Sequence, residues 1–166
     1  MGEAYDKVGR MLGLGYPGGP AVDRLAATGR ATIPFPRPLL GDGLEFSFSG
    51  LKSAVARHLD RGPAAAADVA ASFVEACMTV LLTKCRRALA AWPSQALVIV
   101  GGVAASPPLR AGAKTLCDEL GVELCLPPLR WSTDNAAMIA LATWDYLALD
   151  RPPRALPQLN LAIGDY

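Results

Sequence analysis

The pattern of apolar and polar residues predicts short helices in the first half of the chain and alternating strands and helices in the second. Apolar residues recur at helical spacing in most of the chain, often between a capping residue and a glycine or proline. Helices are expected over 3–14, 20–27, 49–58, 64–92, 107–120 and 133–149. Strands are expected over 44–48, 96–100 and 122–126, where short runs alternate or are continuously apolar.

The second half of the chain has the order of a parallel α/β layer. A continuous apolar run over 96–100 is typical of a strand that is buried on both faces. Strand, helix, strand and helix then follow each other with short links, which favours parallel pairing. Because so few strands make a poor sheet, we expect further strands N-terminal to Met1.

The net charge of +1 excludes a chain whose whole surface is basic. Any contact with RNA must therefore come from a local patch or from a partner protein. Lys84, Arg86 and Arg87 could form such a patch with Arg57 and Arg61. Cations near helix ends are also commonly solvated, so both interpretations stay open.

Cysteine usage and hydropathy favour a cytoplasmic protein. The four cysteines form no Cys-x-x-Cys pair, which indicates reduced core residues. The longest apolar run, over 69–82, is interrupted by Glu75 and is shorter than the roughly 20 residues of a membrane span. The start lacks the basic and apolar pattern of a secretion signal. We expect no membrane contact and no DNA binding.

Two sites at the starts of helices are candidates for ligand chemistry. Gly101 and Gly102 follow a buried strand, where backbone N–H groups could approach a phosphate or ribose, although a plain tight turn explains them as well. Asp134 opens the last expected helix. Its carboxylate can complement the helix dipole or bind a metal, and residue chemistry alone favours the helix cap.

Asp6, Gly19 and Asp23 form a third candidate set, on two short helices and the loop between them. A carboxylate can hold both hydroxyls of a ribose, and a glycine permits close backbone approach. Two solvated aspartates and a turn glycine are the plainer alternative. His58 is the single histidine, so the chain cannot supply a metal site with two histidines.

Six segments, taken in order, resemble the TsaD family of tRNA-modifying enzymes. They are Gly2–Lys7, Leu12–Pro20, Phe35–Pro38, Phe46–Lys52, Gly101–Ala104 and Ser132–Ala140. The resemblance extends to about residue 148. It implies the C-terminal part of an actin-like, sugar-kinase-like (ASKHA) α/β fold, with a ribonuclease-H-like sheet that this chain leaves incomplete.

The resemblance also implies three parts within the chain. A helical and loop insertion that carries a nucleotide-contacting loop is expected over 1–62, followed by an α/β lobe over 63–149. An extended C-terminal tail is expected over 150–166.

The implied activity is transfer of threonylcarbamoyl from threonylcarbamoyl-AMP to N6 of the adenosine 3′ of the anticodon in tRNAs that read ANN codons. The family's metal, commonly iron, is held by two histidines and one aspartate, and Asp134 stands at the aspartate position. Asp6, Gly19 and Asp23 stand at positions that hold the threonylcarbamoyl-adenylate. No residue is assigned as a general base. The implied partners are tRNA and TsaB-like and TsaE-like proteins.

Two departures from the family pattern limit the expectation. The histidine pair and the Ser-Gly-Gly-His-Thr ligand loop would lie N-terminal to this chain, and Ser106 replaces the usual asparagine. We therefore expect the 166-residue chain to be inactive alone. Another ASKHA-fold carbamoyltransferase or ATPase, or a remnant that only binds a nucleotide or partner, remains the alternative.

Overall fold

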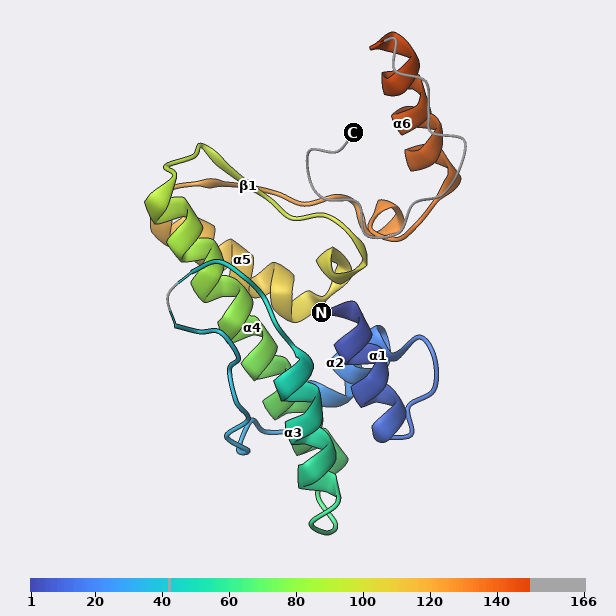
Figure 1. The fold of residues 1–166 in the computed structure, drawn as a ribbon, viewed down its shortest axis with the longest axis vertical. Coiled ribbons are helices and arrows are strands. Elements are labelled where there is room, and N and C mark those ends of the chain that lie inside the picture. Colours follow the sequence, from blue (N-terminus) through green and yellow to red (C-terminus); the bar gives the residue numbers. More distant parts are fainter. Residues whose placement is uncertain (42, 150–166) are drawn as a thin grey trace. The chain divides into compact units, whose positions relative to one another are not determined.

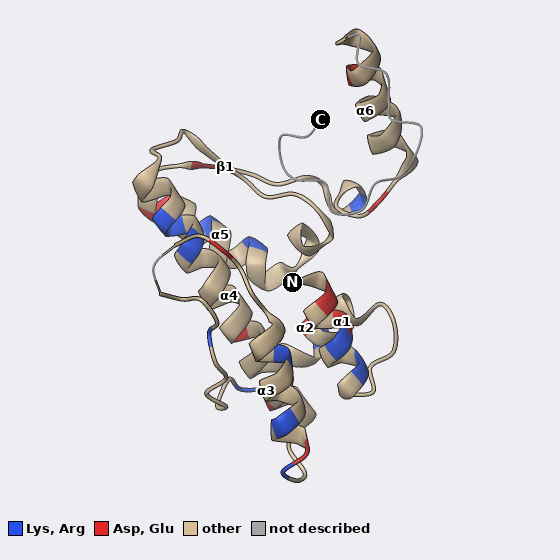
Figure 2. Ribbon diagram, in the orientation of Figure 1, with Lys and Arg blue, Asp and Glu red and all other residues tan. Residues whose placement is uncertain are grey.

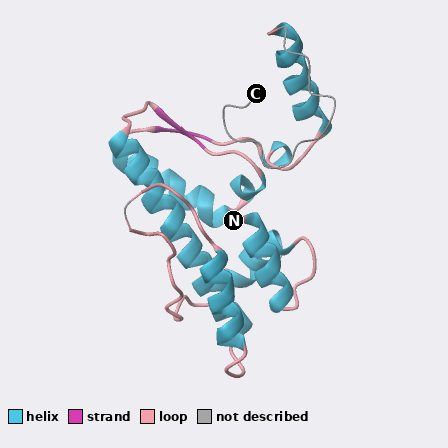
Figure 3. Ribbon diagram, in the orientation of Figure 1, coloured by secondary structure: helices cyan, strands magenta, loops and turns pink. Residues whose placement is uncertain are grey.

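The structure, a computed structural model, describes residues 1–41 and 43–149. It is mostly helical, with one two-stranded parallel sheet (Figure 1 and Figure 3). The chain divides into two compact units, residues 1–133 and 134–166, which are described separately. The expected tail over 150–166 lies outside the described residues.

The first unit contains five α-helices, two short 3₁₀ helices and both strands among its described residues. These are α1 (Gly2–Met11), α2 (Gly18–Ala26), α3 (Ser49–Leu59), α4 (Ala66–Ala91), β1 (Ala96–Val98), η1 (Gly102–Ala105), α5 (Pro107–Leu120), β2 (Glu123–Cys125) and η2 (Leu129–Trp131). The second unit contains α6 (Ala136–Ala148).

Helix α4 is the element against which the other helices of the first unit pack. Helices α2, α3 and α5 contact it directly, and Tyr5 of α1 meets Phe73 edge-on with ring centroids 5.1 Å apart. By length and composition α4 could cross a membrane, but 56% of its most apolar stretch is buried within the protein. Burying each large apolar side chain stabilises the unit by about 1.5–3 kcal/mol, so α4 serves as its core.

Helices α1 and α2 approach so closely that their backbones touch. A Cβ atom at Gly9 would lie 2.9 Å from Gly18 Cα, and one at Gly18 would lie 2.7 Å from Asp6 Cα. Both distances are shorter than carbon atoms tolerate, so only glycine fits at these two positions. The close packing of α1 and α2 is therefore encoded by two glycines.

The two strands pair in parallel, as the order of elements predicts. Leu97 pairs with Leu124 at the centre of the register, and α5 connects the strands. Helix α5 starts with two prolines and ends at Gly121, whose φ of 66° is the left-handed conformation that glycine adopts without strain. Val98 and Val100 are 62% and 72% exposed. The strand was expected to be buried on both faces, but among the described residues the face that carries these two valines is exposed.

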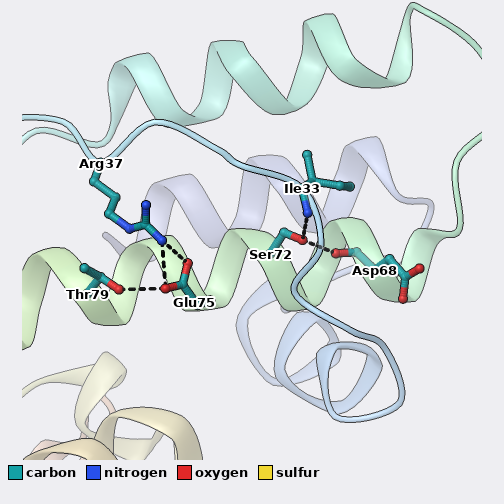
Figure 4. A network of polar contacts seen from close by, with 6 residues as sticks. All are labelled: Ile33, Arg37, Asp68, Ser72, Glu75 and Thr79. Atoms are coloured by element: carbon teal, nitrogen blue, oxygen red, sulfur yellow. Dashed lines mark hydrogen bonds and ion pairs between the residues drawn. The ribbon is translucent and has the colours of Figure 1, made fainter.

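The proline-rich segment after α2 is a loop, and α4 holds its first part (Figure 4). Arg30 N donates a hydrogen bond to Asp68 Oδ1 at 2.8 Å, and Ile33 N donates to Ser72 Oγ at 3.0 Å. Ser72 Oγ in turn donates to the Asp68 carbonyl oxygen at 2.7 Å. Side chains of α4 thus replace the partners that a strand would give these backbone amides.

A second set of contacts holds the remainder of this loop. Arg37 donates to both carboxylate oxygens of Glu75, at 2.9 and 2.8 Å, and Thr79 donates to the same carboxylate (Figure 4). Phe35 is buried and lies edge-on to His58, with ring centroids 5.7 Å apart. His58 is therefore half-buried against the loop, not a fully exposed residue as its polar neighbours suggest.

The strand expected over 44–48 is wrong, because these residues pair with no other described segment. Alternation of apolar and polar residues is compatible with extended backbone, but a β-strand also needs a neighbouring segment whose N–H and C=O groups are free to pair with it. Ser49 is the first residue of α3 and makes no capping hydrogen bond at its start.

Three of the cations proposed as a basic patch are used inside the first unit. Lys84 is buried and donates to the Gly43 carbonyl oxygen at 3.0 Å, and Arg87 donates to the carbonyl oxygen of Gly41. Arg86 forms an ion pair with a glutamate of α5. Lysines and arginines are distributed over several helices in Figure 2. These contacts favour a structural role for the three cations.

The glycine contact between α1 and α2 gives a direct test of this packing. Gly18→Ala is expected to destabilise the first unit by about 1–3 kcal/mol, because the new methyl group must push α1 away from α2. Gly19→Ala is the matched control, since nothing lies within 4 Å of a Cβ there. Urea unfolding followed by circular dichroism measures both. Equal stability of the two variants would show that the close approach is wrong.

Candidate functional site

Asp6 and the start of α2 form the best-defined part of the candidate site. Asp6 Oδ1 accepts a hydrogen bond of 3.0 Å from Gly18 N, one of the free amides in the first turn of α2. Gly19 follows directly, and the space beside its Cα is open for 4 Å. Asp6 thus fixes the turn so that the next residue presents bare backbone, which a ligand can approach closely.

Asp23 lies one helical turn after Gly19 in α2 and is buried, only 9% exposed. Its Oδ1 atom, Tyr5 Oη and Ser106 Oγ are buried, and none completes a hydrogen bond of normal geometry. The two hydroxyls are nevertheless close enough to favour the charged carboxylate and to lower its pKa. Burial is the larger effect and raises the pKa of Asp23 above its ordinary value.

The polar cluster of Tyr5, Asp23 and Ser106 joins three elements that are far apart in sequence. Tyr5 comes from α1 and Ser106 from the junction between η1 and α5. Burial also raises the pKa of Tyr5, so its hydroxyl keeps its proton and can donate it in a hydrogen bond. The carboxylate and the two hydroxyls are hydrogen-bonding groups of the kind that a ribose needs, but all three are buried inside the first unit in this structure.

The sequence pattern identifies Asp23 as a candidate, but it does not identify Tyr5 or the Ser106 hydroxyl as members of the same cluster. Tyr5 precedes Asp6 directly, and Ser106 follows the Gly101–Gly102 turn. Both adjacencies are visible in the sequence. Nothing in the sequence shows that the two hydroxyls meet Asp23, because that contact depends on the packing of α1 and α5.

Asp134 lies outside the helix in which it was expected. Helix α6 begins at Ala136, and Asn135 is its cap, with Asn135 Oδ1 accepting a hydrogen bond of 3.0 Å from Met138 N. The capping role considered for Asp134 is therefore taken by its neighbour, which has the extended backbone that a cap needs. Asp134 is exposed and belongs to the second unit.

The residues present fit a metal only in part. A carboxylate that is not needed as a helix cap is a suitable oxygen ligand for a divalent cation. No group of three histidine, cysteine or acidic side chains comes together among residues 1–41 and 43–149. The described part of the chain therefore offers one candidate ligand and no complete metal site. The ligand roles of Asp6, Gly19, Asp23 and Asp134 stay predictions.

The raised pKa of Asp23 makes the stability of the chain depend on pH. An acid that binds its proton more tightly in the folded state stabilises the fold below its unfolded pKa of about 3.8. That contribution is lost as the pH rises through the folded pKa. Asp23→Asn removes the charge and is expected to stabilise the chain at pH 7 by about 1 kcal/mol, or roughly 2–4 °C in Tm.

Thermal unfolding between pH 4 and 8 measures this effect. Glu123→Gln, which neutralises an exposed carboxylate on β2, is the control and should leave the pH profile unchanged. If Asp23→Asn and Glu123→Gln behave alike, the buried charge of Asp23 has no energetic cost and the description of the cluster is wrong.

The comparisons with known proteins agree on one family. Residues 1–141 match TsaD, described as tRNA N6-adenosine threonylcarbamoyltransferase. A relative of that name from Novosphingobium aromaticivorans is 50% identical over 153 residues, which are 90% of this chain and 44% of the relative. A second, from Persephonella marina, is 48% identical over 144 residues, which are 84% of this chain and 42% of the relative.

A third relative, from Erythrobacter litoralis, is 46% identical over 155 residues. The chain thus spans less than half the length of the curated relatives that it matches. The family match nevertheless covers most of the chain, in agreement with the six sequence motifs. The chain belongs to the TsaD family.

Proposed function

We propose that this chain forms the adenylate-binding part of a threonylcarbamoyltransferase. The complete enzyme would transfer threonylcarbamoyl from threonylcarbamoyl-AMP to N6 of the adenosine 3′ of the anticodon in tRNAs that read ANN codons. The main support is the hydrogen bond from Gly18 to Asp6, which fixes open backbone at Gly19. The similarity to proteins named tRNA N6-adenosine threonylcarbamoyltransferase supports the same reaction.

In this proposal the residues of the chain hold the leaving group and do not move protons. Asp6, Gly19 and Asp23 would bind the adenylate and fix the mixed anhydride for attack by the amine of adenosine. Such positioning converts a bimolecular step into an effectively unimolecular one. The new bond joins N6 to the carbamoyl carbon, the bond from that carbon to the AMP oxygen breaks with its electron pair leaving on AMP, and the proton lost from N6 passes to solvent. The described residues include no evident general base, and none is proposed.

The proposal includes one divalent metal ion, iron, with Asp134 as one ligand. When bound, such an ion polarises a carbonyl or holds a phosphate oxygen. The exposed position of Asp134 and the capping of α6 by Asn135 leave the Asp134 carboxylate available. The remaining ligands would come from a part of the enzyme that the described residues do not supply.

The fold and assembly are further parts of the proposal. We infer that residues 1–62 are a helical insertion and 63–149 an α/β lobe of an ASKHA fold, working in the cytoplasm with TsaB-like and TsaE-like partners. The exposed apolar residues of β1 and α6 support a larger assembly, because α6 buries none of its described residues. The alternative is a remnant that binds a nucleotide at the same adenylate site but does not transfer threonylcarbamoyl.

Adenylate binding can be tested on the 166-residue chain itself. AMP is expected to shift the backbone amide NMR signals of Asp6, Gly19 and Asp23, because the proposal places the ribose and phosphate there. Gly19→Val should abolish these shifts, since a branched side chain fills the open space beside the backbone. Shifts confined to other residues, or none at millimolar AMP, would contradict the proposal.

The metal ligand can be tested in an intact transferase that contains this segment. Asp134→Asn is expected to lower metal occupancy and transfer at least tenfold, because a hard cation prefers a charged oxygen. Since Asn135 caps α6, the same change should leave helix content unchanged. Metal analysis, circular dichroism and modified adenosine in tRNA digests measure the three effects. Full occupancy with normal transfer would show that Asp134 is not a ligand.

A further inference from the structure

A shallow pocket of about 330 Å³ lies beside the N-terminal ends of α1 and α3. None of Asp6, Gly19 and Asp23 lines it. Its lining residues are Met1, Glu3, Ala4, Phe46, Ser47, Phe48, Ser49 and Lys52. The segment that forms one wall is the one expected as a strand and found to be unpaired.

Two aromatic rings give the pocket a flat platform. Phe46 and Phe48 are nearly parallel, with an interplanar angle of 10° and ring centroids 6.5 Å apart. Phe48 packs against the core, whereas Phe46 is 51% exposed. Lys84 lies 6.0 Å from the Phe46 centroid and is itself fixed to the Gly43 carbonyl. Phe48 is held by the core and Phe46 is exposed beside it, and an exposed aromatic ring in a fixed position is suited to stacking of a flat heterocycle.

Glu3 and Lys52 line the pocket, and Lys7 lies beside it on the same carboxylate. Glu3 pairs with Lys7, and Lys52 Nζ lies 3.9 Å from the same carboxylate. Both ammonium groups contact the Glu3 carboxylate, and the nearby ammonium of Lys7 lowers the pKa of Lys52. Two lysines thus share one carboxylate, and an added anion would relieve their repulsion.

We propose that this pocket binds an unpaired nucleotide of the RNA substrate, with its base against Phe46 and Phe48 and its phosphate near Lys52 and Lys7. The inference rests on the proposed function, which makes RNA the substrate. Proteins read single-stranded RNA by stacking unpaired bases on aromatic rings and by pairing phosphates with cations. A free nucleotide also has a flat base and a phosphate, so the experiment must distinguish binding of RNA from binding of a free nucleotide such as AMP.

The test measures binding of a labelled RNA hairpin with an unpaired loop by fluorescence anisotropy. Phe46→Ala is expected to weaken binding about tenfold, the scale of losing one base stack. Lys52→Gln should weaken it less and reduce the slope of log affinity against log salt by about one. Trp92→Ala removes another exposed aromatic side chain, 63% exposed, at the end of α4, and Lys114→Gln removes an exposed cation of α5. Both controls should bind as the unchanged chain does.

Three results would overturn the inference. They are equal affinity of Phe46→Ala and Trp92→Ala, absence of hairpin binding by the unchanged chain, and displacement of the hairpin by AMP together with loss of AMP binding in Phe46→Ala. The last result would assign the pocket to the free adenylate. AMP-induced NMR shifts at Gly19 that persist in Phe46→Ala keep the adenylate proposal separate, so the RNA inference can fail while that proposal stands.

Discussion

Helices α1 and α2 touch through their backbones at Gly9 and Gly18, where even a methyl group would collide. This contact brings Asp6 to within hydrogen-bonding distance of the Gly18 amide. The contact also orients α2 relative to α1, so that Asp23 is buried close to Tyr5 of α1. The candidate adenylate site is therefore a consequence of how closely two short helices pack. A larger residue at either glycine would separate Asp6 from Gly18 before it changed any side chain of the site.

Helix α4 holds the proline-rich loop and the segment before α3 in place. Its side chains bind the amides of the proline-rich loop, and Lys84 reaches across to the Gly43 carbonyl beside Phe46. The loop has no backbone hydrogen bonds to a neighbouring strand, so these side chains supply its partners. Lys84 also lies against Phe46, one of the two aromatic residues that precede α3. The surface ion pair between Arg37 and Glu75 adds at most about 1 kcal/mol, so most of this support comes from the hydrogen bonds of the loop amides and from apolar contacts.

The helices were predictable because their signals are local. The helix expected over 107–120 is found with those bounds, since its prolines and Gly121 act on adjacent backbone. The strand expected over 44–48 failed because pairing depends on a distant segment. Asp134 and Asn135 are equally suitable caps by composition, and only the backbone conformation of the folded chain selects Asn135. The contact of Tyr5 and Ser106 with Asp23 is likewise tertiary, so motif spacing could not reveal it.

The burial of Asp23 does not contribute to the stability of the folded chain, so it needs another explanation. An ionisable group placed among two hydroxyls, without a completed hydrogen bond, costs free energy that an apolar residue of similar size would not. Such a cost is understandable where a ligand supplies the missing partners, because the same unpaired atoms then favour binding. Under the proposed function, Asp23 weakens the free fold and binds the ribose, so the gain in stability from Asp23→Asn should come with a loss of adenylate affinity.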